Sequence, residues 1–116
     1  VITIHAPSLP STHHKFNKEV FKKMKNRSYL INAARGPIVS EEDLIEALKT
    51  GEIAGAGLDV FEFEPEVSEE LRALDNVIRA PHAGTGTIEG RRTLAAEAAA
   101  NILSFFEGNP VNVVNK

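Results

Sequence analysis

Apolar residues gather in short runs that alternate with amphipathic segments along the chain. The runs VITIHA at residues 1–6 and SYLINA at residues 28–33 are apolar at successive positions, which is typical of strands buried on both faces of a parallel sheet. Residues 53–60 predict a third strand whose glycines and alanines indicate close approach of backbone or ligand. Residues 76–80 predict a short fourth strand.

The segments between and after these runs predict helices. Asn17 and Ser40 are good N-cap residues for helices in residues 16–25 and 39–51, and Gly51 is a good stop signal. Ser68 predicts the start of a short helix that ends near Leu74, and residues 88–108 form a long alanine-rich helix. This alternation predicts an α/β fold with a parallel sheet and right-handed crossovers. The last apolar piece, PVNVV, is extended and has no evident strand partner.

Composition narrows the possible partners. Apolar residues make up 42% of the 116 residues, charged residues 25%, and the formal net charge is -3 with no basic block. Nucleic acid and an anionic membrane surface are therefore not expected partners, and no apolar run reaches the roughly 18–20 residues that span a bilayer. The absence of cysteine excludes disulfides and thiolate metal sites and is compatible with the cytoplasm. Because the chain starts at Val1 inside a predicted strand, we expect it to be part of something longer.

Polar residues that could carry chemistry follow the predicted strands. In an open parallel sheet, ligands bind beyond the carboxyl ends of the strands. The residues near those ends are His5, Arg35, Asp59 with Glu64, and His82. An arginine, two carboxylates and two histidines on one edge predict an acid–base site with a clamp for an anion.

Each of these residues also has a plain structural interpretation, such as an ion pair for Arg35 or a turn cap for Asp59. His13 and His14 are expected on the surface, and a solvated acidic face is expected from Glu62, Glu66, Glu69 and Glu70. The acidic residues that open the helix near residue 41 suit the helix dipole and need no other role; they are Glu41, Glu42 and Asp43. A metal site is only weakly indicated, because no H-x-x-H or H-x-x-E pairing is present. PHAGTGTIEGR does not match a phosphate-binding loop.

The stretch NAARGPIVSEEDLIEALKTGEIAGAGLDVFEFEP closely resembles the signature region of the D-isomer-specific 2-hydroxyacid dehydrogenases. That family includes phosphoglycerate dehydrogenases, glyoxylate and hydroxypyruvate reductases, and D-lactate dehydrogenases. The resemblance continues through HAPSLPSTHHKFNKEVFKKMK and NVIRAPHAGTGTIEGR. It implies a Rossmann-like fold, in which residues 1–86 form the C-terminal half of an NAD(P)-binding domain. Residues 87–116 would be a long return helix and a terminal strand that join the substrate domain of a full-length member.

The resemblance assigns roles to particular residues. Arg35 would hold the carboxylate and keto oxygen of a 2-oxo acid, since its planar fork binds a carboxylate through two hydrogen bonds. His82 would protonate the keto oxygen as hydride arrives, and Glu64 would pair with His82 and orient its ring. Asp59 would hydrogen-bond the nicotinamide carboxamide. The other expected cofactor contacts are Ala33, Ala34, Arg35, His82, Ala83, Gly84 and Thr85.

The resemblance therefore implies a parent oxidoreductase that uses NAD or NADP. It would interconvert a small 2-oxo acid and a D-2-hydroxy acid as a cytoplasmic homodimer. The sequence departs from the family pattern at Leu9, where many members have Thr, and at Gly86, where Ala or Ser is usual. A G-x-G-x-x-G turn is not among the 116 residues, so the isolated chain is expected to be inactive. A fragment without function of its own and an NAD(H)-sensing module resembling certain corepressors remain alternatives. Formate dehydrogenases fit less well, because they carry Gln at the position of Glu64.

Overall fold

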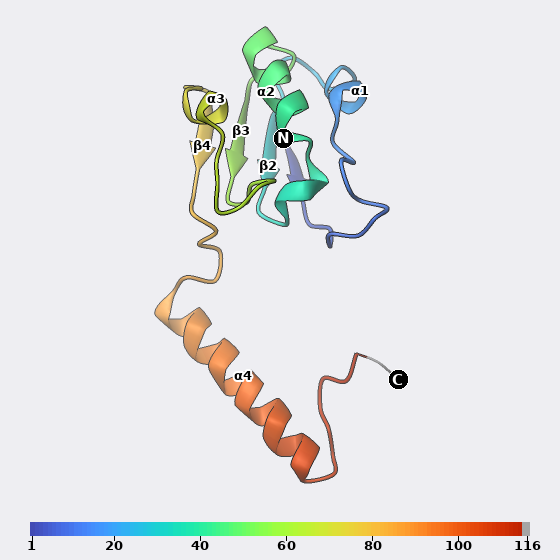
Figure 1. The fold of residues 1–116 in the computed structure, drawn as a ribbon, viewed down its shortest axis with the longest axis vertical. Coiled ribbons are helices and arrows are strands. Elements are labelled where there is room, and N and C mark those ends of the chain that lie inside the picture. Colours follow the sequence, from blue (N-terminus) through green and yellow to red (C-terminus); the bar gives the residue numbers. More distant parts are fainter. Residues whose placement is uncertain (115–116) are drawn as a thin grey trace. The chain divides into compact units, whose positions relative to one another are not determined.

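The computed structural model describes residues 1–114, which divide into two compact units, one of residues 1–82 and one beginning at Ala83. The first unit is built on a four-stranded parallel sheet in the order β1-β2-β3-β4 (Figure 1). The strands are β1 (Ile2–Ile4), β2 (Tyr29–Asn32), β3 (Gly55–Leu58) and β4 (Val77–Arg79). All four lie inside the predicted runs, which confirms the α/β parallel sheet.

Short helical segments connect these strands: α1 (Lys18–Phe21), the 3₁₀ turn η1 (Gly36–Ile38), α2 (Glu41–Thr50) and α3 (Glu69–Arg72). The predicted caps are present, since the side chains of Asn17, Ser40 and Ser68 accept hydrogen bonds from the first turns of α1, α2 and α3. Gly51 ends α2 in the left-handed conformation, with φ of 72°. Helix α1 is shorter than predicted, because Lys23 and Met24 donate to carbonyls three residues back and the chain continues as turns.

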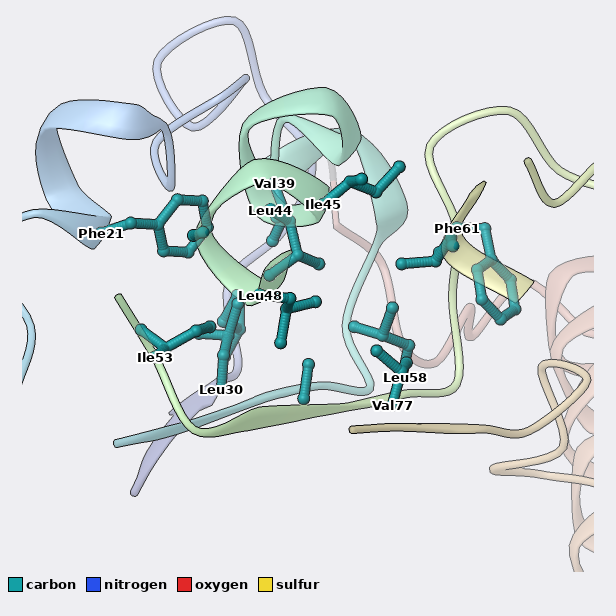
Figure 2. Packing of buried hydrophobic residues seen from close by; sticks show 14 of the residues in the cluster. Phe21, Leu30, Val39, Leu44, Ile45, Leu48, Ile53, Leu58, Phe61 and Val77 are labelled. Carbon is teal, nitrogen blue, oxygen red and sulfur yellow. The ribbon is translucent and has the colours of Figure 1, made fainter. Parts of the chain in front are cut away.

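One hydrophobic core lies between α2 and the sheet. Leu44 and Leu48 project from α2 toward Leu30, Leu58 and Val77 on the strands (Figure 2). The largest fully buried side chains are Phe21, Leu30, Ile38, Leu44, Ile53, Leu71, Val60 and Asn32. This core explains the spacing of the apolar residues in α2, which recur on one side of the helix.

The opposite face of the sheet is open within residues 1–82. Thr3, Tyr29 and Ile78 on that face are exposed, Ile78 to 79%. The prediction that the first two strands are buried on both faces is therefore wrong for this structure. Each connection leads to the neighbouring strand, always in the same direction across the sheet. Because such connections are all right-handed, their helices lie on the same face of the sheet. Apolar residues at successive positions could not reveal that only one face is covered here.

The second unit is the long helix α4 (Ile88–Phe106) with the segment that follows it. Thr87 caps the helix by accepting a hydrogen bond from the Gly90 N–H at 3.0 Å. Residues 110–114 form no strand; within this described segment, the Val111 N–H donates to Ser104 Oγ at 3.2 Å. Residues 115–116, the end of the predicted segment 87–116, lie outside the described residues. Among residues 1–114, no helix combines the length and apolar character needed to cross a membrane.

Candidate active site

The turn after β2 is shaped by a buried asparagine. Asn32 is only 1% exposed, its Oδ1 accepts from the Ala34 N–H at 3.1 Å, and its Nδ2 donates to the Arg35 carbonyl at 3.0 Å. These bonds fix the backbone of the turn just beyond the end of β2, where Ala33 and Arg35 are exposed. Asn32 is not among the predicted site residues, although a polar residue near the end of the apolar run SYLINA was an available signal.

Gly36 brings the loop after β3 against this turn. A Cβ on Gly36 would lie 1.8 Å from the Phe61 carbonyl oxygen and 2.6 Å from the Glu62 nitrogen. Only a residue without a side chain fits there, because these neighbours are backbone atoms that cannot rotate away. The backbone next to Arg35 is thus packed directly on the loop that carries Glu64.

Glu64 and His82 form the pair that the sequence predicts. Glu64 Oε2 lies 2.9 Å from His82 Nδ1, and Glu64 Oε1 accepts the Phe61 N–H at 2.9 Å. The hydrogen bond from His82 is the largest cause that lowers the pKa of the Glu64 carboxyl, which is therefore ionised at neutral pH. An ionised carboxylate only accepts hydrogen bonds, so Nδ1 of His82 carries the proton in this contact.

His82 sits at a backbone position that few residues adopt. Its φ is 52°, in the left-handed region, and its side chain is 49% exposed. Glu64, with its side chain 35% exposed, thus contacts a ring that is itself about half exposed to solvent. Such non-glycine backbone conformations concentrate at functional sites.

Arg35 belongs to the same electrostatic environment. Its Nη1 donates to the Ala34 carbonyl at 2.6 Å, and its charge is a smaller cause of the lowered pKa of Glu64. The three predicted catalytic residues therefore all lie in the first unit and interact. Their arrangement can hold an anion at the guanidinium and exchange a proton at the imidazole.

The predicted cofactor residues divide between the two units. Asp59 follows β3, is half-buried, and donates its N–H to the Asn32 carbonyl at 2.9 Å, so it lies at the same sheet edge as Ala33 and Ala34. The predicted residues of the second unit are Ala83, Gly84 and Thr85. His5, which the sequence places among the strand-edge residues, follows β1 directly and shares a 3.0 Å hydrogen bond with Thr3 of that strand.

The solvated position predicted for Glu62 is wrong in the structure, and Glu41 has contacts beyond the helix dipole. The Glu62 side chain is 11% exposed, and its Oε2 accepts the Glu41 N–H at 2.8 Å. Glu41 is buried, accepts the Ser68 hydroxyl at 2.8 Å, and accepts the Glu62 N–H at 3.4 Å. The loop after β3 lies over the start of α2, whose free N–H groups attract a carboxylate. Both Glu62 and Glu41 therefore fasten this loop.

The surface position predicted for His14 holds in part, since 39% of its side chain is exposed. It is half-buried, and its Nε2 lies 2.5 Å from Glu62 Oε1. His13 is exposed and stacks on the His14 ring. No local motif signals these contacts, because Glu62 is 48 residues from His14 and 21 from Glu41.

Comparison with known proteins identifies the family of this chain. Residues 1–84 match the family model described as "D-isomer specific 2-hydroxyacid dehydrogenase, NAD binding domain". This chain belongs to the D-isomer specific 2-hydroxyacid dehydrogenase family. The resemblance and the nicotinamide-binding fold predicted from the sequence are thereby confirmed.

Relatives cover the chain almost end to end. A protein of Staphylococcus saprophyticus named as a 2-hydroxyacid dehydrogenase is 50% identical over 115 residues, which are 98% of this chain and 36% of that protein. A glyoxylate reductase from Paecilomyes thermophila has a TM-score of 0.93 at 32% identity, covering 97% of this chain and 34% of its own. The NADPH-dependent glyoxylate/hydroxypyruvate reductase of Sinorhizobium meliloti, solved with NADP and malonate, has a TM-score of 0.89 at 35% identity. The match covers 95% of this chain and 36% of the reductase chain. The chain thus spans about a third of the length of these family members.

Proposed function

We propose that this chain carries the catalytic residues of an enzyme that reduces a small 2-oxo acid to the D-2-hydroxy acid. The contact between Glu64 Oε2 and His82 Nδ1 at 2.9 Å, beside Arg35, is the observation that carries the proposal. Family membership and the reductase named among the similar structures support the same reaction.

His82 moves the proton. Because Glu64 accepts the hydrogen on Nδ1, Nε2 is the ring nitrogen left to face the keto oxygen. In the reduction, the imidazolium gives its Nε2 proton to that oxygen, and the neutral ring remains. In the reverse reaction, the neutral Nε2 takes the proton from the hydroxyl group. Glu64 keeps the ring oriented through its hydrogen bond to Nδ1.

Arg35 binds the substrate carboxylate and polarises the keto oxygen. Its exposed guanidinium presents several N–H donors in one plane, which match the two oxygens of a carboxylate. This positions the reacting carbon relative to His82 and stabilises the negative charge that develops on the keto oxygen. Malonate, a dicarboxylate, is bound in the structure of the reductase from Sinorhizobium meliloti, which agrees with a carboxylate clamp in this family.

The residues at the edge of the sheet fit a nicotinamide ring. Ala33 and Ala34 offer single methyl groups at the end of β2, and the half-buried Asp59 at the end of β3 offers carboxylate acceptors to the carboxamide. The dinucleotide supplies the hydride when it is bound. We include Ala83, Gly84 and Thr85 among the residues that contact it.

The wider assignment rests on the family. We propose that residues 1–86 act as the C-terminal half of an NAD(P)-binding domain and that residues 87–116 join it to a substrate domain. The working enzyme would be a cytoplasmic homodimer that uses NAD or NADP. The isolated chain would be inactive, since a G-x-G-x-x-G turn for the pyrophosphate is not among its residues.

A chimera tests this function. The segment of the Staphylococcus saprophyticus relative that matches this chain is replaced by the 116 residues, and reduction of glyoxylate, pyruvate and hydroxypyruvate is measured with NADH and NADPH. We expect activity in the chimera, a roughly 100- to 10,000-fold loss of kcat in His82→Gln, and a roughly 10- to 100-fold loss of kcat/KM in Arg35→Lys. In Glu64→Gln, kcat/KM should fall about fivefold, because a charge-assisted hydrogen bond is roughly twice as strong as a neutral one.

Glu66→Gln is the matched control, since Glu66 is an exposed carboxylate two residues beyond Glu64. It should leave both kcat and KM unchanged. A folded chimera in which His82→Gln retains the parent's kcat would exclude His82 as the acid–base residue and overturn the proposal.

A further inference from the structure

A cluster of three side chains on the first unit has the composition of a transition-metal site. His13, His14 and Glu62 each offer one ligand atom, and these atoms all lie within 4.8 Å of one another. Two imidazoles and one carboxylate are a ligand set that proteins use for zinc with an open coordination position. We propose that these residues bind one divalent cation of the zinc class. The proposal does not depend on the dehydrogenase reaction.

The backbone presents both histidines on one side. Adjacent residues in an extended chain point to opposite sides, but His14 has φ of 47°, in the left-handed region. The two rings stack with centroids 3.9 Å apart and an interplanar angle of 29°. The turn is held in place, because the His14 N–H donates to the Pro37 carbonyl at 2.9 Å and Asn17 Nδ2 donates to the His14 carbonyl at 3.1 Å. Little backbone ordering therefore remains for a cation to impose.

The Glu62 carboxylate is oriented by a hydrogen bond to its second oxygen. Glu62 Oε2 accepts the Glu41 N–H at 2.8 Å, so Oε1 faces His14 Nε2 at 2.5 Å. A ligating carboxylate that is hydrogen-bonded through its second oxygen is typical of protein metal sites, because the outer contact fixes the direction of the first oxygen. The side chain is only 11% exposed, which favours its interaction with a cation over solvation by water.

Small movements would complete the coordination. Bonds of about 2.0–2.2 Å to zinc place tetrahedral ligand atoms about 3.3–3.6 Å apart. His14 and Glu62 would open from their present 2.5 Å, and the cation would take the place of the proton they share. His13 would move inward, and because it is exposed it can do so without disturbing the core.

The alternative is that His14 and Glu62 form only an ion pair that fastens two loops. The two interpretations differ at His13, which a metal site needs and the ion pair does not. His13→Gln leaves the contact between His14 and Glu62 in place, so it tests metal binding separately from loop attachment. Glu62→Gln removes a ligand and the ion pair together and serves as the second variant.

The experiment uses the full 116-residue chain at a pH where imidazoles are neutral. Zn²⁺ binding is measured by calorimetric titration, and Co²⁺ binding by its visible absorption. We expect one ion per chain, with affinity reduced at least about tenfold in His13→Gln and in Glu62→Gln. His5→Gln is the matched control and should bind as the parent does, because His5 contacts Thr3 on its own strand. Zn²⁺ should also raise the Tm of the parent but not that of His13→Gln.

Three results would overturn the proposal. The first is no saturable binding of Zn²⁺ or Co²⁺ by the folded parent. The second is unchanged affinity in His13→Gln, which would leave His14 and Glu62 as an ion pair only. The third is an equal loss in His5→Gln, which would mean that the ions bind to surface histidines without a defined site.

Discussion

The contact between Gly36 and the loop after β3 makes a sharp prediction about stability. In Gly36→Ala the new Cβ would start 1.8 Å from the Phe61 carbonyl oxygen, whereas real Cβ atoms essentially never approach within 3.0 Å. The Phe61–Glu62 backbone must therefore retreat by at least 1.2 Å. That segment is held by the Phe61 N–H on Glu64 and by the Glu62 carboxylate on Glu41, so the movement strains both contacts.

The magnitude follows from two opposing terms. Inserting a methyl group into a packed region costs about 1–3 kcal/mol, and the upper end applies here because the obstacle is backbone. Alanine lowers the entropy of the unfolded chain, which returns about 0.4–1 kcal/mol. We expect a net loss of about 2 kcal/mol in the free energy of unfolding.

Urea unfolding of the 116-residue chain, followed by far-UV circular dichroism, measures this loss. The matched control is Gly57→Ala, where the new Cβ meets only the Cδ1 end of the flexible Ile31 side chain, at 3.0 Å. That control should stay within about 1 kcal/mol of the parent. If Gly36→Ala is as stable as Gly57→Ala, the backbones of the two loops are not packed as described.

Two further predictions concern the core and the surface of α2. Leu48→Ala should lose about 2–5 kcal/mol in the same urea assay, because Leu48 is 4% exposed between α2 and the sheet, and a loss below 1 kcal/mol would contradict this packing. Lys49 lowers the pKa of the Glu70 carboxyl through a hydrogen bond. The pair therefore stabilises the folded chain above the ordinary pKa of 4.5, and this stabilisation is lost as the pH falls through the lowered pKa. The urea midpoint of Lys49→Gln should therefore lie below that of the parent at pH 7, and the difference should shrink under acid conditions; an equal difference at both pH values would refute the assignment.

Features that depend on neighbouring residues could be predicted from the sequence. Asn17, Ser40 and Ser68 cap helices because each side chain bonds to an N–H three residues ahead, and Gly51 ends α2 because of its own backbone freedom. The grouping of Arg35, Glu64 and His82 could also be predicted, since parallel strands send their carboxyl ends to one edge. Their roles followed from the family resemblance and remain predictions.

Features that depend on distant contacts could not be predicted. Glu62 resembles any exposed acidic residue of the FEFEPE stretch, and its burial depends on His14, 48 residues away, and on Glu41, 21 residues away. The open face of the sheet was missed for a related reason. Whether an apolar strand residue such as Ile78 is covered depends on which side the crossover helices take, and this is decided by the order of all four strands.

The same distant contacts explain why an arginine and a glycine stand side by side at the end of β2. Arg35 alone could be placed there by the Asn32 side chain, which holds the turn from within. Glu64, however, belongs to the loop after β3, whereas its partner His82 follows β4, so the loop after β3 must come close to the end of β2 for Arg35, Glu64 and His82 to lie together. Gly36 permits that approach because the Phe61 carbonyl occupies the space of a side chain. The Phe61 N–H then binds Glu64, which in turn holds His82. A displacement at Gly36 should thus reach the His82 imidazole through a single chain of contacts, which run from the Phe61 backbone to Glu64 and from Glu64 to His82.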